Sequence, residues 1–495
     1  MRITNRMMTN NMMNNINKNK VNMTALEQQY STGKKIQKPS EDPIVAVRAL
    51  KLRTNLSELE QYYEKNIPDA KSWMDVTESA LTTVNGILSS INTYCVQGSS
   101  DTLTAHDRAA IVENLDQMRQ QIYQEGNTNY AGRYVFTGFK TDSSLIFTEN
   151  SPTLNYSITE NFTGDQIQIV NKTVGGYVLS DFTAGETFDK APQYEQCYRL
   201  QLSYDGLDAK NPGEINYSIK DADGNVEEKT LTITKSCSLE DPDAYSPADG
   251  EINYIYETGE IIMGKGIYET IRIAENINLT YDKSGFSKGD LKPEHYFNCK
   301  MTDTSKPEQD EITFTKETQK IQYEVNFNQR LTINTEGSDA FSHQIGRVVS
   351  DIMNAVNEVA AVENIIAEVE NRLKDTTLSD TDKARYEKMK EQLDTELVLK
   401  RESMQQAFER GMTVSSAEQN RLNVAISDLG SRYVRLELTE DRLSSQKVDF
   451  TDLLSTNEDV DLADTIIKYG AAETIYNASL SAASKIVKTS LLDFL

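Results

Sequence analysis

The chain has 495 residues with 51 basic and 76 acidic side chains, a formal net charge of −25, and 38% of its residues are hydrophobic. A surface that binds nucleic acid needs clustered Lys and Arg to neutralise phosphates, so this charge argues against a nucleic-acid partner. No apolar run is long enough for a cleaved signal peptide or a bilayer span. We therefore expect no membrane contact, and either a cytosolic location or export by a route that reads no cleaved hydrophobic signal.

The first long helical region is expected between residues 44 and 125. Its apolar residues recur at alternating steps of three and four, the pattern of a helix that packs on another helix. Turn-forming residues at 39–43 and 98–101 mark its breaks. Trp73 is expected to anchor the core between the helices, because large aromatic side chains dominate packing energy. The clearest stripe consists of Leu81, Val84, Leu88, Ile91 and Cys95.

Residues 130–335 have a different pattern. Short alternating runs rich in Val, Ile, Thr and Tyr are separated by Gly, Asn and Asp, which predicts β-strands. The sequence DADGN at 221–225 lies between two such runs and predicts a hairpin turn. It also resembles the start of an EF-hand loop, but Val226 stands where that loop needs Gly, and Thr232 stands where it needs a bidentate Glu. We therefore prefer the turn to a calcium site.

Helical periodicity returns near Ala340. Two segments, 341–373 and 380–411, are separated by DTTLSD and predict a hairpin of two helices. A further stripe follows, and the polar run at 455–464 interrupts the pattern before a last helix. The further stripe comprises Leu422, Ile426, Leu429, Tyr433, Leu436, Leu443, Phe450 and Leu454.

The order of the chain is thus helix, sheet, helix. A helix with one apolar stripe gains most of its stability from a partner, and the simplest partner for the first 125 residues is the last 155. We predict an α+β protein: a long discontinuous helical bundle or coiled-coil rod formed by both chain ends, with a β-rich domain inserted in the middle. The expected domains are a terminal assembly domain (1–42 with 458–495), a helical rod (43–145 with 336–457) and the β-rich region (146–335), which an alternative plan divides into 146–190 and 191–335.

The terminal segments carry narrow stripes interrupted by Asn, Ser and Ala. Ordering each residue costs roughly 1–2 kcal/mol of backbone entropy, so two such helices bury too little to be stable alone. We expect this pair to order only inside an assembly and to make contacts between molecules; the alternative is that its stripes form intramolecular core. The candidate assembly residues are Ile3, Met7, Ile16, Met23 and Leu26 at one end and Ile466, Tyr476, Leu480, Val487, Leu491 and Phe494 at the other.

Several motifs resemble the flagellin superfamily and occur in matching order, over roughly residues 1–145 and 415–495. Within the superfamily, the Pro39–Pro43 spacing, the GRYVF run at 132–136 and the LLDFL ending favour the flagellin-like hook-associated subunits of the hook–filament junction over flagellin itself. The motifs are STGKKIQKPSEDPIVAVRALKLRTNLSELEQYYEKN at 31–66, SWMDVTESAL at 72–81, NTNYAGRYVFTGFKT at 127–141, RYVRLELTEDRL at 432–443 and SLLDFL at 490–495.

This resemblance implies a structural subunit of the bacterial flagellum. It would form a ring or helical layer of its own copies between the other junction protein and flagellin. Export would pass through the flagellar type III apparatus, with an export chaperone and no cleaved signal, to an extracellular position in the flagellum. The basic N-terminal region is then an export signal that is later buried, which we prefer to a membrane-surface helix.

The residues give no support for catalysis. His106, His295 and His343 have no metal-binding spacing, and the glycines of MGKG at 263–266 stand too close together for a phosphate loop. The four cysteines are widely spaced without a CxxC motif, which argues against a disulfide framework. We expect no enzyme activity, no catalytic residue, no metal and no cofactor. Two alternatives stay open: flagellin itself, or a surface adhesin or enzyme carried on the β-rich insertion.

Overall fold

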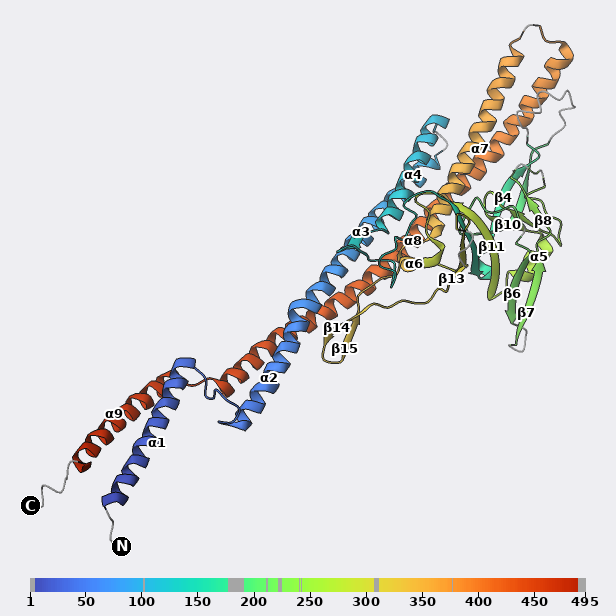
Figure 1. Ribbon diagram of the computed structural model, residues 1–495. Coiled ribbons are helices and arrows are strands. Elements are labelled where there is room, and N and C mark those ends of the chain that lie inside the picture. The colour runs from blue at the N-terminus through green and yellow to red at the C-terminus, as the bar shows by residue number, and fades with distance from the viewer. Residues whose placement is uncertain are drawn as a thin grey trace, which may run out of the picture. The chain divides into compact units, whose positions relative to one another are not determined.

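The computed structural model describes residues 5–100, 103–176, 191–210, 212–220, 225–239, 241, 243–306, 311–375 and 377–487. Both chain ends form long helices and the middle is rich in strands, which confirms the predicted α+β arrangement (Figure 1). The chain forms two compact units, one of residues 1–70, 323–331 and 434–495, the other of residues 71–322 and 332–433. These limits differ from the domain limits expected from the sequence, and the three-domain plan stays a prediction.

The first unit is built from helices of both chain ends. It contains α1 (Asn5–Thr32), α2 (Pro43–Gln61), a π-helical turn (Tyr62–Asn66), the start of α3 (Ile67–Gly98), the end of α8 (Asp380–Glu458) and α9 (Leu462–Val487). Asp42 caps α2 by accepting from the N–H groups of Ile44 at 3.0 Å and Val45 at 3.2 Å, and Pro43 occupies the first helical position.

In this unit α2 and the end of α8 run antiparallel. Arg53 pairs with Glu458 at 2.5 Å, and the Lys447 ammonium pairs with Glu64 at 2.6 Å near the other end of α2. Leu59 of α2 and Leu443 of α8 are buried. The short hairpin of β14 (Gln322–Asn326) and β15 (Gln329–Thr332) adds residues 323–331 to the unit.

The second unit contains most of the helical rod: α3, α4 (Ala105–Glu125), α7 (His343–Leu373) and α8. α3 and α8 are antiparallel, because the Asn92 amide donates to the Ser415 hydroxyl at 3.1 Å while Asn85 donates to Asn423 at 3.1 Å. Trp73 is 1% exposed, as expected for a core anchor. The predicted stripe is confirmed in the core: Leu81, Val84, Leu88, Ile91 and Cys95 are all buried.

The predicted hairpin of α7 and α8 is confirmed at its start. Glu370 of α7 pairs with Lys390 of α8 at 2.7 Å, and Glu363 pairs with Arg401 at 2.8 Å, an antiparallel register (Figure 1). A small core fills the space between the two helices. Its buried members are Val362, Ile365, Val369, Met389 and Leu393.

The expected end of the second hairpin segment at residue 411 is wrong, because α8 continues through Gly411 to Glu458. A Cβ atom on Gly411 would lie 2.8 Å from the Cys95 sulfur and 2.8 Å from the Ile352 side chain. Such contacts are too short for a real Cβ atom, so a side chain here would displace one of its neighbours. The glycine therefore allows three helices to approach closely and does not end a helix.

Most strands of the second unit form two sheets. The six-stranded sheet is antiparallel throughout, in the order β13 (Ile312–Phe314), β12 (Asn298–Asp303), β3 (Ser151–Phe162), β11 (Asn276–Phe286), β6 (Glu214–Lys220) and β7 (Val226–Thr232). β6 and β7 pair up to Lys220 and Val226, as the predicted hairpin requires; residues 221–224 of the turn lie outside the described residues.

The five-stranded sheet has the order β4 (Gln168–Val174), β5 (Gln193–Gln201), β10 (Glu260–Met263), β9 (Ile252–Ile255) and β8 (Lys235–Cys237), with only β8 and β9 parallel. One core cluster includes residues of both sheets, among them Ile158, Tyr281, Leu200 and Tyr254. The smaller elements are β1 (Asn129–Tyr130), β2 (Arg133–Tyr134), α5 (Lys265–Ile271) and α6 (Gly337–Ala340).

A buried ion cluster fastens the five-stranded sheet to α7. Arg199 of β5 is 2% exposed and contacts Glu260 of β10 at 2.5 Å and Asp351 of α7 at 2.8 Å. Burial alone would raise the pKa of Glu260, but the charges of Arg199 and Lys172, together with hydrogen bonds from Tyr245 and Arg199, lower that pKa to about 2. Removing one member of a buried pair leaves the other charge unpaired, so this contact fixes where the sheet meets the helix.

Leu429 tests the importance of the α8 stripe. We expect Leu429→Ala to lower the free energy of unfolding by about 2–5 kcal/mol, because truncating a buried leucine loses apolar burial and leaves a cavity. Val424, on the same helix, is 70% exposed while Leu429 is 1% exposed, so Val424→Ala is the matched control and should change stability by less than about 0.5 kcal/mol. Denaturant unfolding of the purified chain measures the free energy of unfolding of both variants. Equal losses of stability would contradict the assignment of Leu429 to a buried stripe.

Candidate functional site

The two terminal helices, α1 and α9, form an antiparallel pair (Figure 1). Their less exposed positions alternate in steps of four and three, which is the seam of a two-helix coiled coil. The Asn19 amide of α1 donates to the Ser479 hydroxyl of α9 at 3.2 Å across this seam. The seam positions are Met12, Ile16, Asn19, Met23 and Leu26 on α1 and Tyr469, Ala472, Tyr476, Ser479 and Ala483 on α9.

The structure separates the candidate assembly residues into two groups. Ile16 is buried and Met23, Leu26 and Tyr476 are half-buried, so these four occupy seam positions within one molecule. The exposed members are Met7, Ile466 and Leu480, with 56%, 50% and 42% of their surface accessible. Val487 is the last residue of α9, but its side chain lies outside the described part, as do Ile3, Leu491 and Phe494. The assembly role of all these residues stays a prediction.

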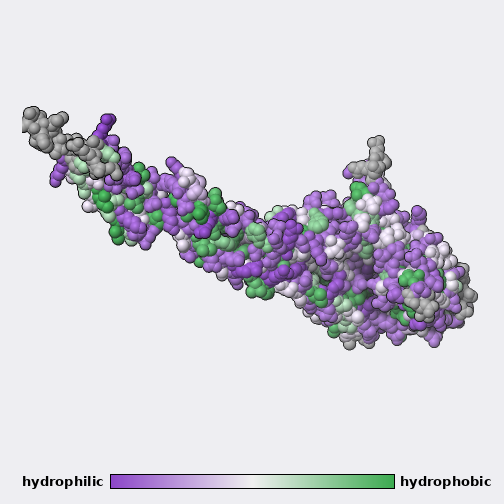
Figure 2. Space-filling model, turned by 90° about the horizontal axis from the view of Figure 1, so that it is seen from below, coloured by the Kyte–Doolittle hydropathy of each residue, from purple (hydrophilic) through white to green (hydrophobic). Residues whose placement is uncertain are grey.

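Further exposed apolar residues on the same two helices were missed by the sequence reasoning, which followed only the stripe. They lie outside the three–four repeat of the stripe, and a count of all apolar residues along each helix could have found them. Figure 2 shows apolar residues, in green, on the surface next to the grey chain ends. The missed residues are Met8, Met13 and Val21 on α1 and Ile467 and Ile475 on α9.

Two short connections run side by side where α1 and α9 join the helices of the same unit. The Lys35 N–H donates to the Glu458 carbonyl at 2.6 Å, and the Val460 N–H donates to the Gly33 carbonyl at 3.0 Å. Gly33 has a φ of +71°, which favours glycine. The Lys34 ammonium contacts Asp459 at 2.5 Å. Its hydrogen bond lowers the pKa of Asp459, and the Asp459 hydrogen bond in turn raises the pKa of Lys34.

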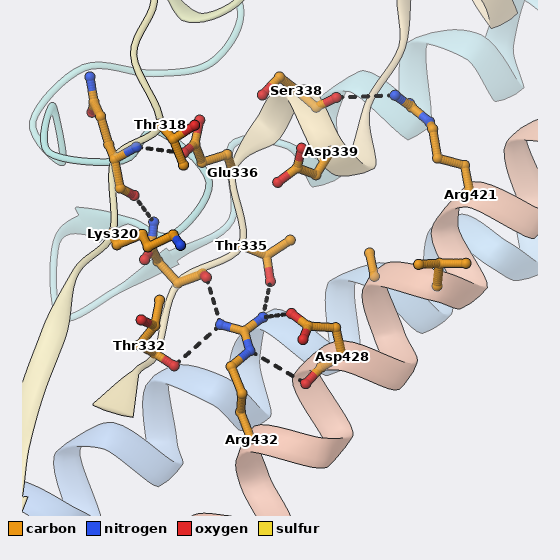
Figure 3. Close-up of a pocket in the computed structure, with 14 residues that line it drawn as sticks. Thr318, Lys320, Thr332, Thr335, Glu336, Ser338, Asp339, Arg421, Asp428 and Arg432 are labelled. Atoms are coloured by element: carbon orange, nitrogen blue, oxygen red, sulfur yellow. Dashed lines mark hydrogen bonds and ion pairs between the residues drawn. The ribbon is translucent and has the colours of Figure 1, made fainter. Parts of the chain in front are cut away.

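A cavity of about 520 Å³ lies in the second unit between α8 and the segment that returns from the β-rich region (Figure 3). The Arg432 guanidinium points from α8 into this segment and donates to the carbonyls of Asn334 at 2.8 Å and Thr332 at 3.2 Å. It also pairs with Asp428 at 2.9 Å. Arg421 donates to the Ser338 carbonyl at 3.0 Å. The arginines hold the returning chain against α8.

The lining of this cavity contains charged side chains of both signs. Burial, and then the nearby Glu336 charge, raise the pKa of Asp339. The described lining residues include neither histidine nor cysteine, and the lining carboxylate Asp428 pairs with Arg432. Within the described residues, no group of three His, Cys, Asp or Glu side chains is placed to hold a metal. The four cysteines are buried and unpaired with one another.

Across the described ranges, no helix from α1 to α9 has the length and apolarity that a bilayer span requires.

Comparisons with known proteins match both ends of the chain. Residues 3–141 match the bacterial flagellin N-terminal helical region, and residues 413–495 match the bacterial flagellin C-terminal helical region. Over 145 residues the chain is 32% identical to flagellar hook-associated protein 3 of Salmonella typhimurium, covering 29% of this chain and 45% of that protein. Over 128 residues it is 31% identical to a flagellin of Clostridium tyrobutyricum, covering 26% of this chain and 34% of that protein.

The chain thus spans less than half the length of the curated relatives that it matches. Among solved structures, the flagellar junction protein of Legionella pneumophila aligns over 84% of this chain and 100% of that chain, with 10% identity and a TM-score of 0.28. A similarity at that level does not establish a shared fold.

The Lys34–Asp459 pair predicts a pH dependence of the α1–α9 connection. Because the folded-state pKa of Asp459 is lowered, its stabilising effect is present above the unfolded-state value and is lost as the pH falls through the folded-state pKa. Opening of the amides of Lys35 and Val460, measured by hydrogen exchange and corrected for intrinsic rates, should become easier by about 0.2–1 kcal/mol below about pH 4. Lys34→Gln should reduce the change, because only the Ser455 hydrogen bond and the Lys35 charge would then lower the pKa of Asp459, and Lys38→Gln should retain it; an unaltered dependence in Lys34→Gln would refute the assignment.

Arg432 offers a second test. Arg432→Ala removes the charged donor to two backbone carbonyls, so we expect the free energy of unfolding to fall by about 1–3 kcal/mol. Arg435→Ala, an exposed arginine on the same helix, is the control and should have little effect. Thermal unfolding followed by circular dichroism measures both variants. A stability equal to that of the unaltered chain would show that Arg432 does not hold the returning segment.

Proposed function

We propose that the protein is a structural subunit of the bacterial flagellum that joins the hook to the filament, because the two ends of the chain match the N-terminal and C-terminal helical regions of bacterial flagellin. The observation that carries this proposal is the pairing of the matched regions: α1 and α9 come from opposite ends of the chain and lie together. Relatives named flagellar hook-associated protein 3 in two bacteria support the junction role.

The α1–α9 pair is suited to assembly by its two kinds of apolar residue. The seam residues hold the two helices together within one molecule, while Ile466 and Leu480 expose apolar surface outside the seam. Exposed apolar residues gathered on one element are typical of protein interfaces. We infer that these outer residues contact neighbouring subunits, which would be copies of this chain, the other junction protein and flagellin. Whether the pair orders without such neighbours stays a prediction.

The proposal includes a route and a location. The subunit reaches the flagellum outside the cell through the flagellar type III export apparatus, with an export chaperone and without a cleaved signal. Its role is structural, without a substrate, which agrees with the helical regions of a structural flagellar protein at its ends. An enzyme or adhesin function of the β-rich insertion is not required by this role.

The second candidate function is flagellin itself. The 31% identity to a clostridial flagellin favours it, although that match covers a smaller share of both chains than the match to hook-associated protein 3. The number of copies separates the two functions, because a filament subunit is present in very many copies and a junction subunit in few. Quantitative mass spectrometry of purified flagella gives that number.

Deletion of the gene tests the junction role. Without a junction subunit, flagellin has no site on which to polymerise, so we expect unpolymerised flagellin in the medium and cells without full-length filaments. Restoring the unaltered gene should restore filaments. Restoring Ile466→Asn should not, because the substitution places an amide on the proposed contact, whereas Ala471→Asn, which leaves the exposed apolar residues of α9 unchanged, should restore them. Full-length filaments in the deletion strain would rule the junction role out.

A further inference from the structure

A second cavity, of about 380 Å³, lies in the second unit between the strands and the beginning of α7. Its walls come from β3, β4, β5, α7, α8 and nearby loops. Pockets for small molecules begin at roughly 300 Å³, so this volume suits a molecule the size of a single sugar ring. Among its lining residues are Gln166, Gln201, Phe297, His343, Arg347 and Arg410.

The lining is rich in arginine. Arg347, Arg410 and Arg421 all border the cavity, and Glu160 and Asp165 are the acidic residues among its described lining. Burial raises the pKa of Glu160 to about 7, so this carboxyl is partly neutral near neutral pH. Glu160 is also engaged, because it accepts hydrogen bonds from Ser203 and Tyr281. Arg347 pairs with Asp205 at 3.2 Å and Arg421 pairs with Glu418 at 2.8 Å, so Arg410 is the arginine of this lining that a negatively charged occupant would contact.

Arg410 is the cation whose charge is least matched. Its guanidinium lies 3.6 Å from Asp351 Oδ2, beyond hydrogen-bond length, while the same oxygen lies 2.8 Å from Arg199. One carboxylate oxygen thus serves two guanidinium groups. Burial, and then the positive charge of Arg199, lower the pKa of Arg410. An anion beside Arg410 would raise the pKa of Arg410 again, because its negative charge would offset the effects of burial and of the Arg199 charge.

The start of α7 adds donors to the same wall. Ser342 caps the helix by accepting from the Gln344 N–H at 2.9 Å, and the first-turn N–H groups of a helix carry partial positive charge. Burial lowers the pKa of His343 to about 3, so its imidazole is neutral, whereas Arg347 Nε is a buried donor that has no hydrogen-bond partner in the part of the chain that the structure describes. Arg347 is 7% exposed, so its unpaired nitrogen has no access to bulk water.

Neutral groups complete the lining. The Gln201 amide nitrogen donates to Asp351 Oδ1 at 3.0 Å, which fixes the orientation of its amide. The Gln166 carbonyl oxygen accepts from the Thr163 N–H at 2.9 Å, which fixes a second amide. Tyr296 and Phe297 supply aromatic surface. Fixed amides beside an aromatic ring suit a molecule that has hydroxyl groups and an apolar ring face.

We propose that this cavity binds a small polyhydroxylated carboxylate, a sugar acid of one ring, with its carboxylate at Arg410 and the α7 N-terminus and its hydroxyl groups at Gln166 and Gln201. This site is separate from the terminal helices and does not depend on the assembly role. The β-rich region and the helices α7 and α8 would share this binding function.

Calorimetric titration of the full chain with glucuronate tests the site. We expect saturable binding of one glucuronate per chain. Glucose, which has the same ring and no carboxylate, should bind at least about tenfold more weakly, because a charge-assisted hydrogen bond to arginine is lost. Hydrogen exchange should show slower exchange at residues 342–348 with glucuronate and no change with glucose. Absence of glucuronate binding, or equal affinity for glucose, would overturn the proposal.

A pair of arginines on α8 supplies the matched variants. Arg410→Gln should weaken glucuronate binding at least about tenfold, whereas Arg401→Gln should leave it unchanged, because Arg401 pairs with Glu363 away from the cavity. Circular dichroism checks that both variants fold. If Arg410→Gln fails to fold, Gln166→Ala replaces it, since Gln166 is exposed at the rim and should also weaken binding. Unchanged affinity in a folded cavity variant would refute the site.

Discussion

The helices α2 and α3 near the start of the chain each have a narrow apolar face, and that face is buried against α8, which comes from the other end of the chain. α3 and α8 satisfy this condition in one unit, where Asn85 meets Asn423 and Asn92 meets Ser415. α2 and the end of α8 satisfy it in the other, with Arg53 on Glu458. Because hydrophobic burial is the main stabilising contribution, the helices of both ends depend on each other for their stability.

The β-rich region is attached to this helical pairing by charge as well as by packing. Arg199 joins two strands to Asp351 of α7, and Arg432 holds the returning segment on α8. A buried charged group is costly without its partner, so such contacts define position more strictly than apolar contacts do. The sheets therefore meet the helices at a defined place, and the sugar-acid cavity that we propose lies beside the same Asp351.

The sequence predicted the features that depend on local periodicity. The stripe from Leu81 to Cys95 and the hairpin before Lys390 were confirmed, because one side chain per turn is visible in the order of residues. The continuity of α8 through Gly411 was not predicted, since the reason for that glycine is the close approach of Cys95 and Ile352, which are distant in sequence. Strand order was equally inaccessible, because pairing across a sheet depends on non-local contacts.

The candidate site, like the fold, could be predicted only in part from the sequence. Periodicity located the terminal helices, but it could not separate Ile16, which faces α9, from Met7, which does not. The residues that line the sugar-acid cavity come from five separate ranges of the chain (160–168, 200–203, 296–297, 338–348 and 410–421), and their convergence has no signature in sequence spacing. Family motifs identified the ends of the chain and carried no information about this region.

The hydrogen bond between Asn19 and Ser479 joins residues that are 460 positions apart. A chain is made from its N-terminus, so α1 exists long before its partner does. Until α9 has been made, the seam residues Met12, Ile16 and Met23 of α1 have no partner helix to pack against. The α1–α9 pair therefore forms only after α9 has been made, and a chain that stops before α9 leaves the seam face of α1 without a partner helix.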